Sequence, residues 1–140
     1  MENEPKIIAQ YVASGQVKIV ARMLAQSGEV SLRAAEAAEC GGEQGKFWQM
    51  RSAIFVDQSR LFSGETDSML TAIAAGIGLD TAAFGECLLA GTYREPILRG
   101  FEAAKQEGIR TRPVFDINGS RLIGAQPYEE FVRVIDAALP

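Results

Sequence analysis

The side chains best suited to covalent chemistry are those of Cys40 and Cys87, the two cysteines of a chain that has no histidine. A cysteine thiolate attacks disulfides and binds metal ions. The two cysteines lie far apart in the sequence and do not form a Cys-x-x-Cys motif. Without histidine, Cys-His and Ser-His-Asp sites are excluded, and an ordinary zinc site would need carboxylate ligands. We predict no catalytic cysteine pair, no metal site and no cofactor.

Two further motifs lie near the first cysteine. Glu36, Glu39 and Glu43 follow one another at helical spacing, which we interpret as a solvated helix face. Gly41-Gly42 and Gly45 do not make a phosphate-binding loop, because no strand precedes them and their spacing fits no such loop. We expect Gly41-Gly42 to interrupt a helix.

The periodicity of the apolar residues predicts the elements that position these groups. Asn118-Gly119 is typical of a two-residue hairpin turn, and Asp80 is placed to cap a helix. The order of elements is a helix-rich block inside an α-β…β-β-α frame. The predicted helices cover 5–14, 31–40, 43–57, 67–76, 80–90, 93–107 and 127–139, and the predicted strands 17–24, 113–117 and 121–123.

Composition and charge narrow the classes of function. The chain has 140 residues, 47% hydrophobic and 23% charged, which is typical of one globular domain. Its net charge of −4 disfavours a nucleic-acid partner. No apolar run reaches the roughly 18 residues of a membrane span. The acidic start is not a secretory signal, which predicts a cytoplasmic protein if Met1 is the natural start.

Two long stretches together carry a family resemblance. The end of the chain, Gly108–Gly119 and Leu122–Tyr128, resembles the final ββα unit of DsbA-like thiol-disulfide oxidoreductases. The middle, Ala34–Cys40 and Glu43–Trp48, resembles the helical insert of that family, and so does the stretch from Gly78 to Leu88. The resemblance covers nearly the whole chain but begins about midway along the family pattern. The family's first strand and its Cys-x-x-Cys are absent, so the chain resembles a fragment.

The resemblance implies the fold. We expect an α/β, truncated thioredoxin-like (DsbA-like) fold, with a few-stranded mixed sheet and a large helical insert. Residues 1–140 would form a single domain, in which 1–24 and 108–140 make the thioredoxin-like part and 25–107 the insert. If the chain is a fragment of a typical family member, the resemblance implies an extracytoplasmic location.

The resemblance also implies site residues. Pro113 matches the family's cis-proline, and the backbone of the residue before that proline holds a substrate peptide in the family. Arg112 stands where the family has a small or β-branched residue, so we expect its side chain to be solvated or to contact an acidic partner. Arg112 and Pro113 are the predicted substrate-binding residues, and a polypeptide is the implied substrate or partner.

The missing family strand is central in the sheet, so its absence would leave two strand edges unpaired. Residues 17–24 would then pair directly with 113–117, or two copies of the chain would cover each other. We predict a homodimer, because helices 5–14 and 127–139 also lose apolar neighbours.

The two cysteines fall where some family members have paired cysteines in the insert. The resemblance therefore allows a structural disulfide between Cys40 and Cys87, and the alternative is two buried free thiols. We interpret the chain as a family member that is inactive alone, because it lacks the redox cysteine pair. The alternative is a redox-inactive, dimeric binding or scaffold module; a glutathione-linked enzyme ranks last because no residues specify such a site.

Overall fold

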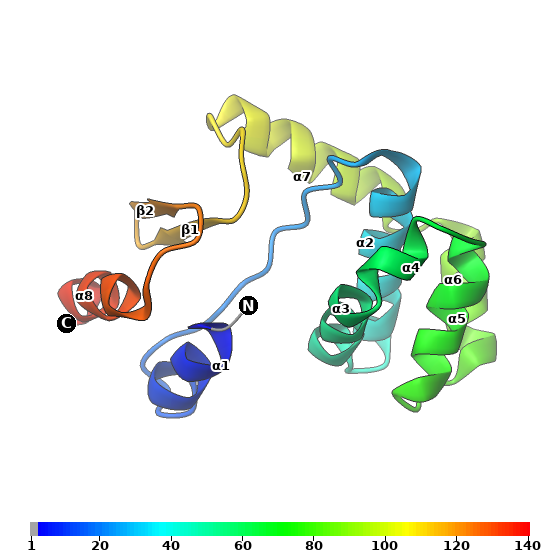
Figure 1. Cartoon of the computed structure of the whole chain (residues 1–140), viewed down its shortest axis with the longest axis horizontal. Coiled ribbons are helices and arrows are strands. Elements are labelled where there is room, and N and C mark those ends of the chain that lie inside the picture. The colour runs from blue at the N-terminus through cyan, green and yellow to red at the C-terminus, as the bar shows by residue number, and fades with distance from the viewer. Residues whose placement is uncertain (1–2) are drawn as a thin grey trace. The chain divides into compact units, whose positions relative to one another are not determined.

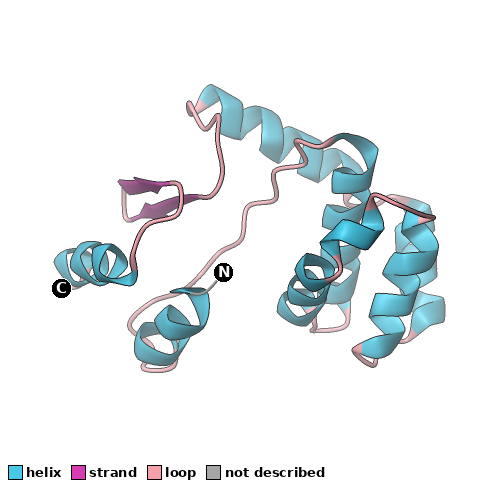
Figure 2. Cartoon of the chain, viewed as in Figure 1, coloured by secondary structure: helices cyan, strands magenta, loops and turns pink. Residues whose placement is uncertain are grey.

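The computed structural model describes residues 3–140, which divide into two compact units. One unit comprises the described residues up to Ala21 together with Lys105–Pro140, and so contains segments from both ends of the chain. The other comprises Arg22–Ala104 and contains helices joined by turns. Figure 2 shows that the chain is mainly helical and that its strands form one hairpin. The predicted class, a helical insert within an α/β frame, is therefore confirmed.

The helical unit is built around α2 (Gly28–Glu43), which contacts α3 (Phe47–Val56), α5 (Thr66–Gly76) and α6 (Thr81–Ala90) (Figure 1). The short α4 (Gln58–Leu61) follows α3, and α7 (Arg94–Gln106) follows α6. The Asp80 carboxylate accepts hydrogen bonds from the Ala82 and Ala83 amides, so the predicted cap of α6 is confirmed. Side chains from five helices and the turn before α6 form one core: Ala37, Ala38, Cys40, Met50, Ile54, Leu61, Leu70, Ile73, Ala74, Leu79, Phe84 and Leu88.

Helix α2 continues through Gly41 and Gly42, so the predicted interruption is wrong. Packing explains the difference. A Cβ at Gly41 would lie 2.8 Å from the Cβ of Met50 and 3.4 Å from the carbonyl oxygen of Lys46. Glycine weakens a helix, but here it lets α3 approach α2 closely, and that packing outweighs the local preference.

The two adjacent glycines should therefore respond oppositely to alanine. Gly41→Ala is expected to lower the free energy of unfolding by about 1–3 kcal/mol, because the completely buried Met50 cannot move aside. At Gly42 the nearest atom to an added Cβ is 3.5 Å away, an ordinary contact, so Gly42→Ala should be neutral or stabilise by up to about 1 kcal/mol. Urea unfolding followed by circular dichroism measures both, and equal effects would contradict the close approach.

The other unit begins with α1 (Asn3–Ile7), which continues into a π-helical turn, η1 (Ile8–Val12). Strands β1 (Val114–Ile117) and β2 (Ser120–Ile123) form an antiparallel hairpin, and α8 (Tyr128–Ala138) follows. Asn118 and Gly119 both have positive φ, at 48° and 92°, as the predicted hairpin turn requires. The buried core of this unit consists of Ile7, Tyr11, Phe131 and Ile135.

Residues 17–24 do not form a strand, so the predicted mixed sheet is wrong in this detail. Within residues 3–140 the sheet has two strands, β1 and β2, paired antiparallel. Burial alternates along 17–23 as in a strand, and Val17 and Ile19 pack against the core of their unit. β-Branched residues favour extended backbone, but a strand also needs a neighbouring ladder of hydrogen bonds. That ladder is missing from the described part of the chain.

Tyr11 ties the first helical segment to α8, and its hydroxyl donates a hydrogen bond to Asp136 Oδ1 at 2.8 Å. Burial, followed by this hydrogen bond, raises the pKa of Tyr11 to about 12. An unfolded tyrosine loses its proton near pH 10, so the stability that Tyr11 contributes is complete below pH 10 and is lost as the pH rises towards 12. Tyr11→Phe is expected to make urea midpoints less dependent on pH between 9.5 and about 11.5. An unchanged slope in Tyr11→Phe would contradict this.

Candidate functional site

Cys40 and Cys87 form a disulfide that joins α2 to α6. The sequence left a disulfide and two free thiols as alternatives, and the structure has the disulfide. Cys40 is 1% exposed inside the core of the helical unit, whereas Cys87 is half-buried. Neither cysteine in the described residues is a free thiol. In this state neither cysteine of the described residues supplies a thiolate.

Arg112 and Pro113 lie immediately before β1, and both side chains are exposed. The peptide bond between them is cis. These two residues belong to the unit formed by the chain ends, whereas both cysteines belong to the helical unit. The predicted site residues therefore fall into two separate groups.

A charged network within the helical unit is a feature that sequence reasoning missed. Glu36 was expected on a solvated helix face, but only 2% of its side chain is exposed. Its Oε2 accepts hydrogen bonds from Arg33 Nη1 at 3.4 Å and Arg94 Nη1 at 3.3 Å. A carboxylate this well buried is stable only when cations or donors compensate its charge. Two arginines do so at Oε2, whereas the buried Oε1 has no hydrogen-bond partner among the described residues. The i, i+3 spacing of Arg33 and Glu36 was the one sequence signal for the pair.

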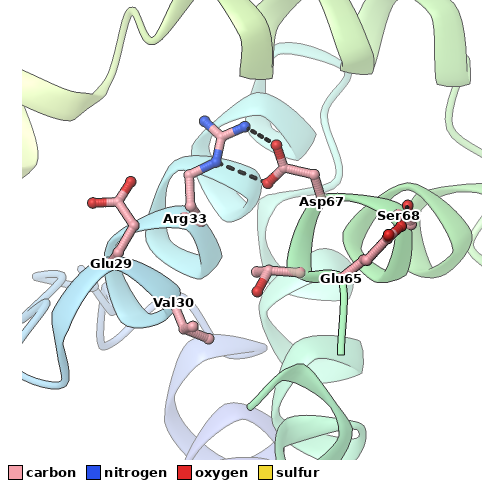
Figure 3. Close-up of a pocket in the computed structure, with 7 residues that line it drawn as sticks. Glu29, Val30, Arg33, Glu65, Asp67 and Ser68 are labelled. Carbon is pink, nitrogen blue, oxygen red and sulfur yellow. Dashed lines mark hydrogen bonds and ion pairs between the residues drawn. The ribbon is translucent and has the colours of Figure 1, made fainter. Parts of the chain in front are cut away.

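Two more exposed carboxylates, those of Asp67 and Glu29, also belong to the network. Arg33 makes a bidentate pair with Asp67 at the start of α5, with Nε–Oδ1 and Nη2–Oδ2 distances of 2.9 and 2.6 Å (Figure 3). Arg94 Nη2 lies 2.5 Å from Glu29 Oε2. Arg33 Nη1 also donates to the carbonyl oxygen of Leu88 at 2.9 Å. Helices α2, α5, α6 and α7 are thus connected through two arginines.

The charges in this network shift one another's protonation. The hydrogen bond from Arg33 lowers the pKa of Asp67, and the hydrogen bond from Arg94 lowers the pKa of Glu29. The same two contacts raise the pKa of each arginine. The ion pairs hold both carboxylates ionised, so they are poor candidates for general acids near neutral pH.

Two nearby groups have pKa values raised chiefly by burial. Partial burial raises the pKa of Glu39, and burial and a hydrogen bond to Glu43 raise the pKa of Tyr93. The Tyr93 hydroxyl donates to Glu43 Oε1 at 3.0 Å. Glu36 is buried, Glu39 is half-buried and Glu43 is exposed, so the three glutamates do not share one solvated face.

An open pocket of about 460 Å³ lies beside this network, between α2 and the start of α5 (Figure 3). Arg33 and Asp67 already bind each other there, and Ser68 donates to Glu65 Oε2 at 3.2 Å. In residues 3–140 no three histidine, cysteine or acidic side chains come close enough to hold a metal ion. The pocket therefore has polar walls whose groups mostly satisfy one another. Its lining consists of Glu29, Val30, Arg33, Glu65, Thr66, Asp67 and Ser68.

Comparison with known proteins decides the family. A family model described as thioredoxin matches residues 1–137, nearly the entire chain. The chain belongs to the thioredoxin family. The family recognised from the sequence is thereby confirmed at the level of the thioredoxin fold, with the helical unit as its insert.

A curated relative of this thioredoxin-family chain is a much longer protein. The Na(+)/H(+) antiporter NhaA 1 of Salinispora arenicola (strain CNS-205) is 30% identical over 105 residues. The matched part covers 75% of the chain but 16% of the antiporter. The chain thus spans about a sixth of that relative's length. In the described part of the chain itself, every helix is too short or too polar to cross a bilayer.

Proposed function

We propose that this chain is a DsbA-like member of the thiol-disulfide oxidoreductase group that does not catalyse disulfide exchange with these 140 residues alone. The observation that supports the proposal is the state of the cysteines in a thioredoxin-family chain. The sequence has no Cys-x-x-Cys, and its two cysteines are consumed in the Cys40–Cys87 disulfide. The redox cysteines of an oxidoreductase built on this chain would have to lie outside these residues.

An insulin-reduction assay with dithiothreitol tests the proposal. We expect insulin to precipitate at the rate of the protein-free control, because turnover requires a thiol of lowered pKa, and neither cysteine lies in a Cys-x-x-Cys motif or beside a histidine even after dithiothreitol reduces the disulfide. The Cys40→Ala/Cys87→Ala double variant is the matched control. Acceleration that persists in this double variant would overturn the account, because it would require chemistry that uses neither cysteine.

The polypeptide-binding role belongs to the same proposal. Its support is the exposed position of Arg112 and Pro113 directly before β1, together with their match to the family's substrate-binding residues. Structural disulfides persist in oxidising compartments, which favours the extracytoplasmic location over the cytoplasmic one.

A dimeric binding or scaffold module is the second candidate. It is favoured by the small core of the unit formed by the chain ends, in which four residues are buried and eight apolar residues, among them Val17 and Ile19, are only partly buried. Apolar surface of this kind is covered when two copies associate. Light scattering at micromolar concentration tests the dimer, and a monodisperse monomer would exclude it.

A further inference from the structure

We propose that the Cys40–Cys87 disulfide is a redox latch, by which we mean a covalent tie that holds α6 against the core of the helical unit until a dithiol reduces it. The dithiol attacks the sulfur of Cys87. The first argument is the unequal exposure of the two sulfur-bearing residues. Cys40 is buried in the core of the helical unit, and Cys87 is half-buried at the edge of that core. A thiolate from solvent therefore reaches the disulfide through Cys87.

The exchange has a defined direction. The attacking thiolate forms a bond to Cys87 Sγ, the Cys40–Cys87 bond breaks, and the electron pair leaves on Cys40 Sγ. The apolar surroundings of Cys40 disfavour a charged thiolate, so the leaving sulfur takes up a proton. The second thiol of the dithiol then attacks the reagent sulfur that is bonded to Cys87 in the mixed disulfide, and Cys87 is released as a thiol. The dithiol becomes a cyclic disulfide, and the protein gains two electrons and two protons.

The contacts around α6 show what the latch holds. The residue after Cys87 is Leu88, whose carbonyl oxygen accepts the 2.9 Å hydrogen bond from Arg33. Leu88 and Phe84 are 4% and 0% exposed, so α6 also has apolar anchors in the core. Reduction removes the covalent tie, so α6 is then held by noncovalent contacts such as these. The expected consequence is local opening of α6, with the remaining fold retained.

The reduced state depends on Arg33 more than the oxidised state does. With the disulfide closed, α6 has a covalent tie to α2 in addition to the Arg33–Leu88 hydrogen bond. With it open, that hydrogen bond remains as a polar contact between α6 and α2 close to Cys87, and the Gln44–Asp80 hydrogen bonds remain at the other end of α6. The charged network is thus a second contact, besides the disulfide, that holds α6 against α2.

The direction of attack is tested on the unaltered chain. The oxidised protein is treated briefly with glutathione, quenched with acid and mapped by mass spectrometry. We expect the glutathione adduct on Cys87 and a free thiol on Cys40. An adduct on Cys40, or equal amounts on both, would overturn the proposed direction. In single variants, the Cys87 thiol of Cys40→Ala should react with a disulfide reagent at least about tenfold faster than the Cys40 thiol of Cys87→Ala.

The latch itself is tested by hydrogen exchange of the full chain before and after dithiothreitol. We expect the acceleration of amide exchange on reduction to be about tenfold or more greater in residues 81–90 than in the rest of residues 28–104, while residues 128–138 and the overall helix signal remain unchanged. Unchanged exchange in 81–90 after complete reduction would show that the disulfide is no latch. A loss of protection no greater in residues 81–90 than in the rest of residues 28–104 would overturn the proposal in favour of a purely structural cross-link, because a lower free energy of unfolding alone speeds exchange evenly. Neither outcome bears on insulin turnover, so this test is separate from that of the proposed function.

Discussion

Cys40→Ala/Cys87→Ala is expected to lower the free energy of unfolding by roughly 4 kcal/mol. The disulfide joins residues 47 positions apart, and in the chain-entropy account its removal restores to the unfolded chain the freedom of a loop of that length. Urea unfolding of the oxidised protein and the double variant measures the difference. Because small domains are stable by about 5–15 kcal/mol, the variant is expected to remain folded.

Reduced wild-type protein is the control for this prediction. Reduction removes the cross-link without removing the two sulfur atoms, so it separates loop entropy from the small cavity that alanine leaves at buried Cys40. We expect the reduced protein to lose nearly as much stability as the double variant. Equal stability of the reduced and oxidised proteins would show that the cross-link contributes nothing.

Arg33→Met is expected to lower the free energy of unfolding by about 3 kcal/mol. Methionine retains much of the apolar length of arginine but supplies none of its hydrogen bonds. The substitution removes the pairs to Asp67 and Glu36 and the donor to the Leu88 carbonyl. The side chain of Glu36 is 2% exposed and would keep its ion pair with Arg94 but lose the one with Arg33. Removing one partner of a buried carboxylate is costly, because the charge stays buried with fewer cations beside it.

Arg99→Met is the matched control within the same unit. Arg99 pairs with Glu95 on the surface of α7, and its side chain is 66% exposed. Exposed pairs of this kind contribute about 0–1 kcal/mol, so this variant should be nearly as stable as the wild type. Similar losses in Arg33→Met and Arg99→Met would show that burial of the network has no energetic consequence.

The sequence by itself determined the features that depend on neighbouring residues. Asn118-Gly119 adopts positive φ with little strain, so the hairpin could be predicted. The Asp80 cap and the amphipathic α8 depend on contacts within a few residues in the same way. The absence of histidine and of a Cys-x-x-Cys likewise excludes whole classes of chemistry whatever the fold, because the required side chains are not in the chain.

The tertiary structure decided the features that depend on distant partners. Residues 17–24 have the composition of a strand but remain outside the sheet, because a strand exists only beside another strand. Gly41 lies within α2 because the close approach of α3 leaves no room for a side chain there. Glu36 is buried because Arg94, 58 residues away, meets it. Cysteine pairing likewise depends on the contact between α2 and α6. Each outcome follows from packing between segments far apart in the chain, which local sequence patterns do not encode.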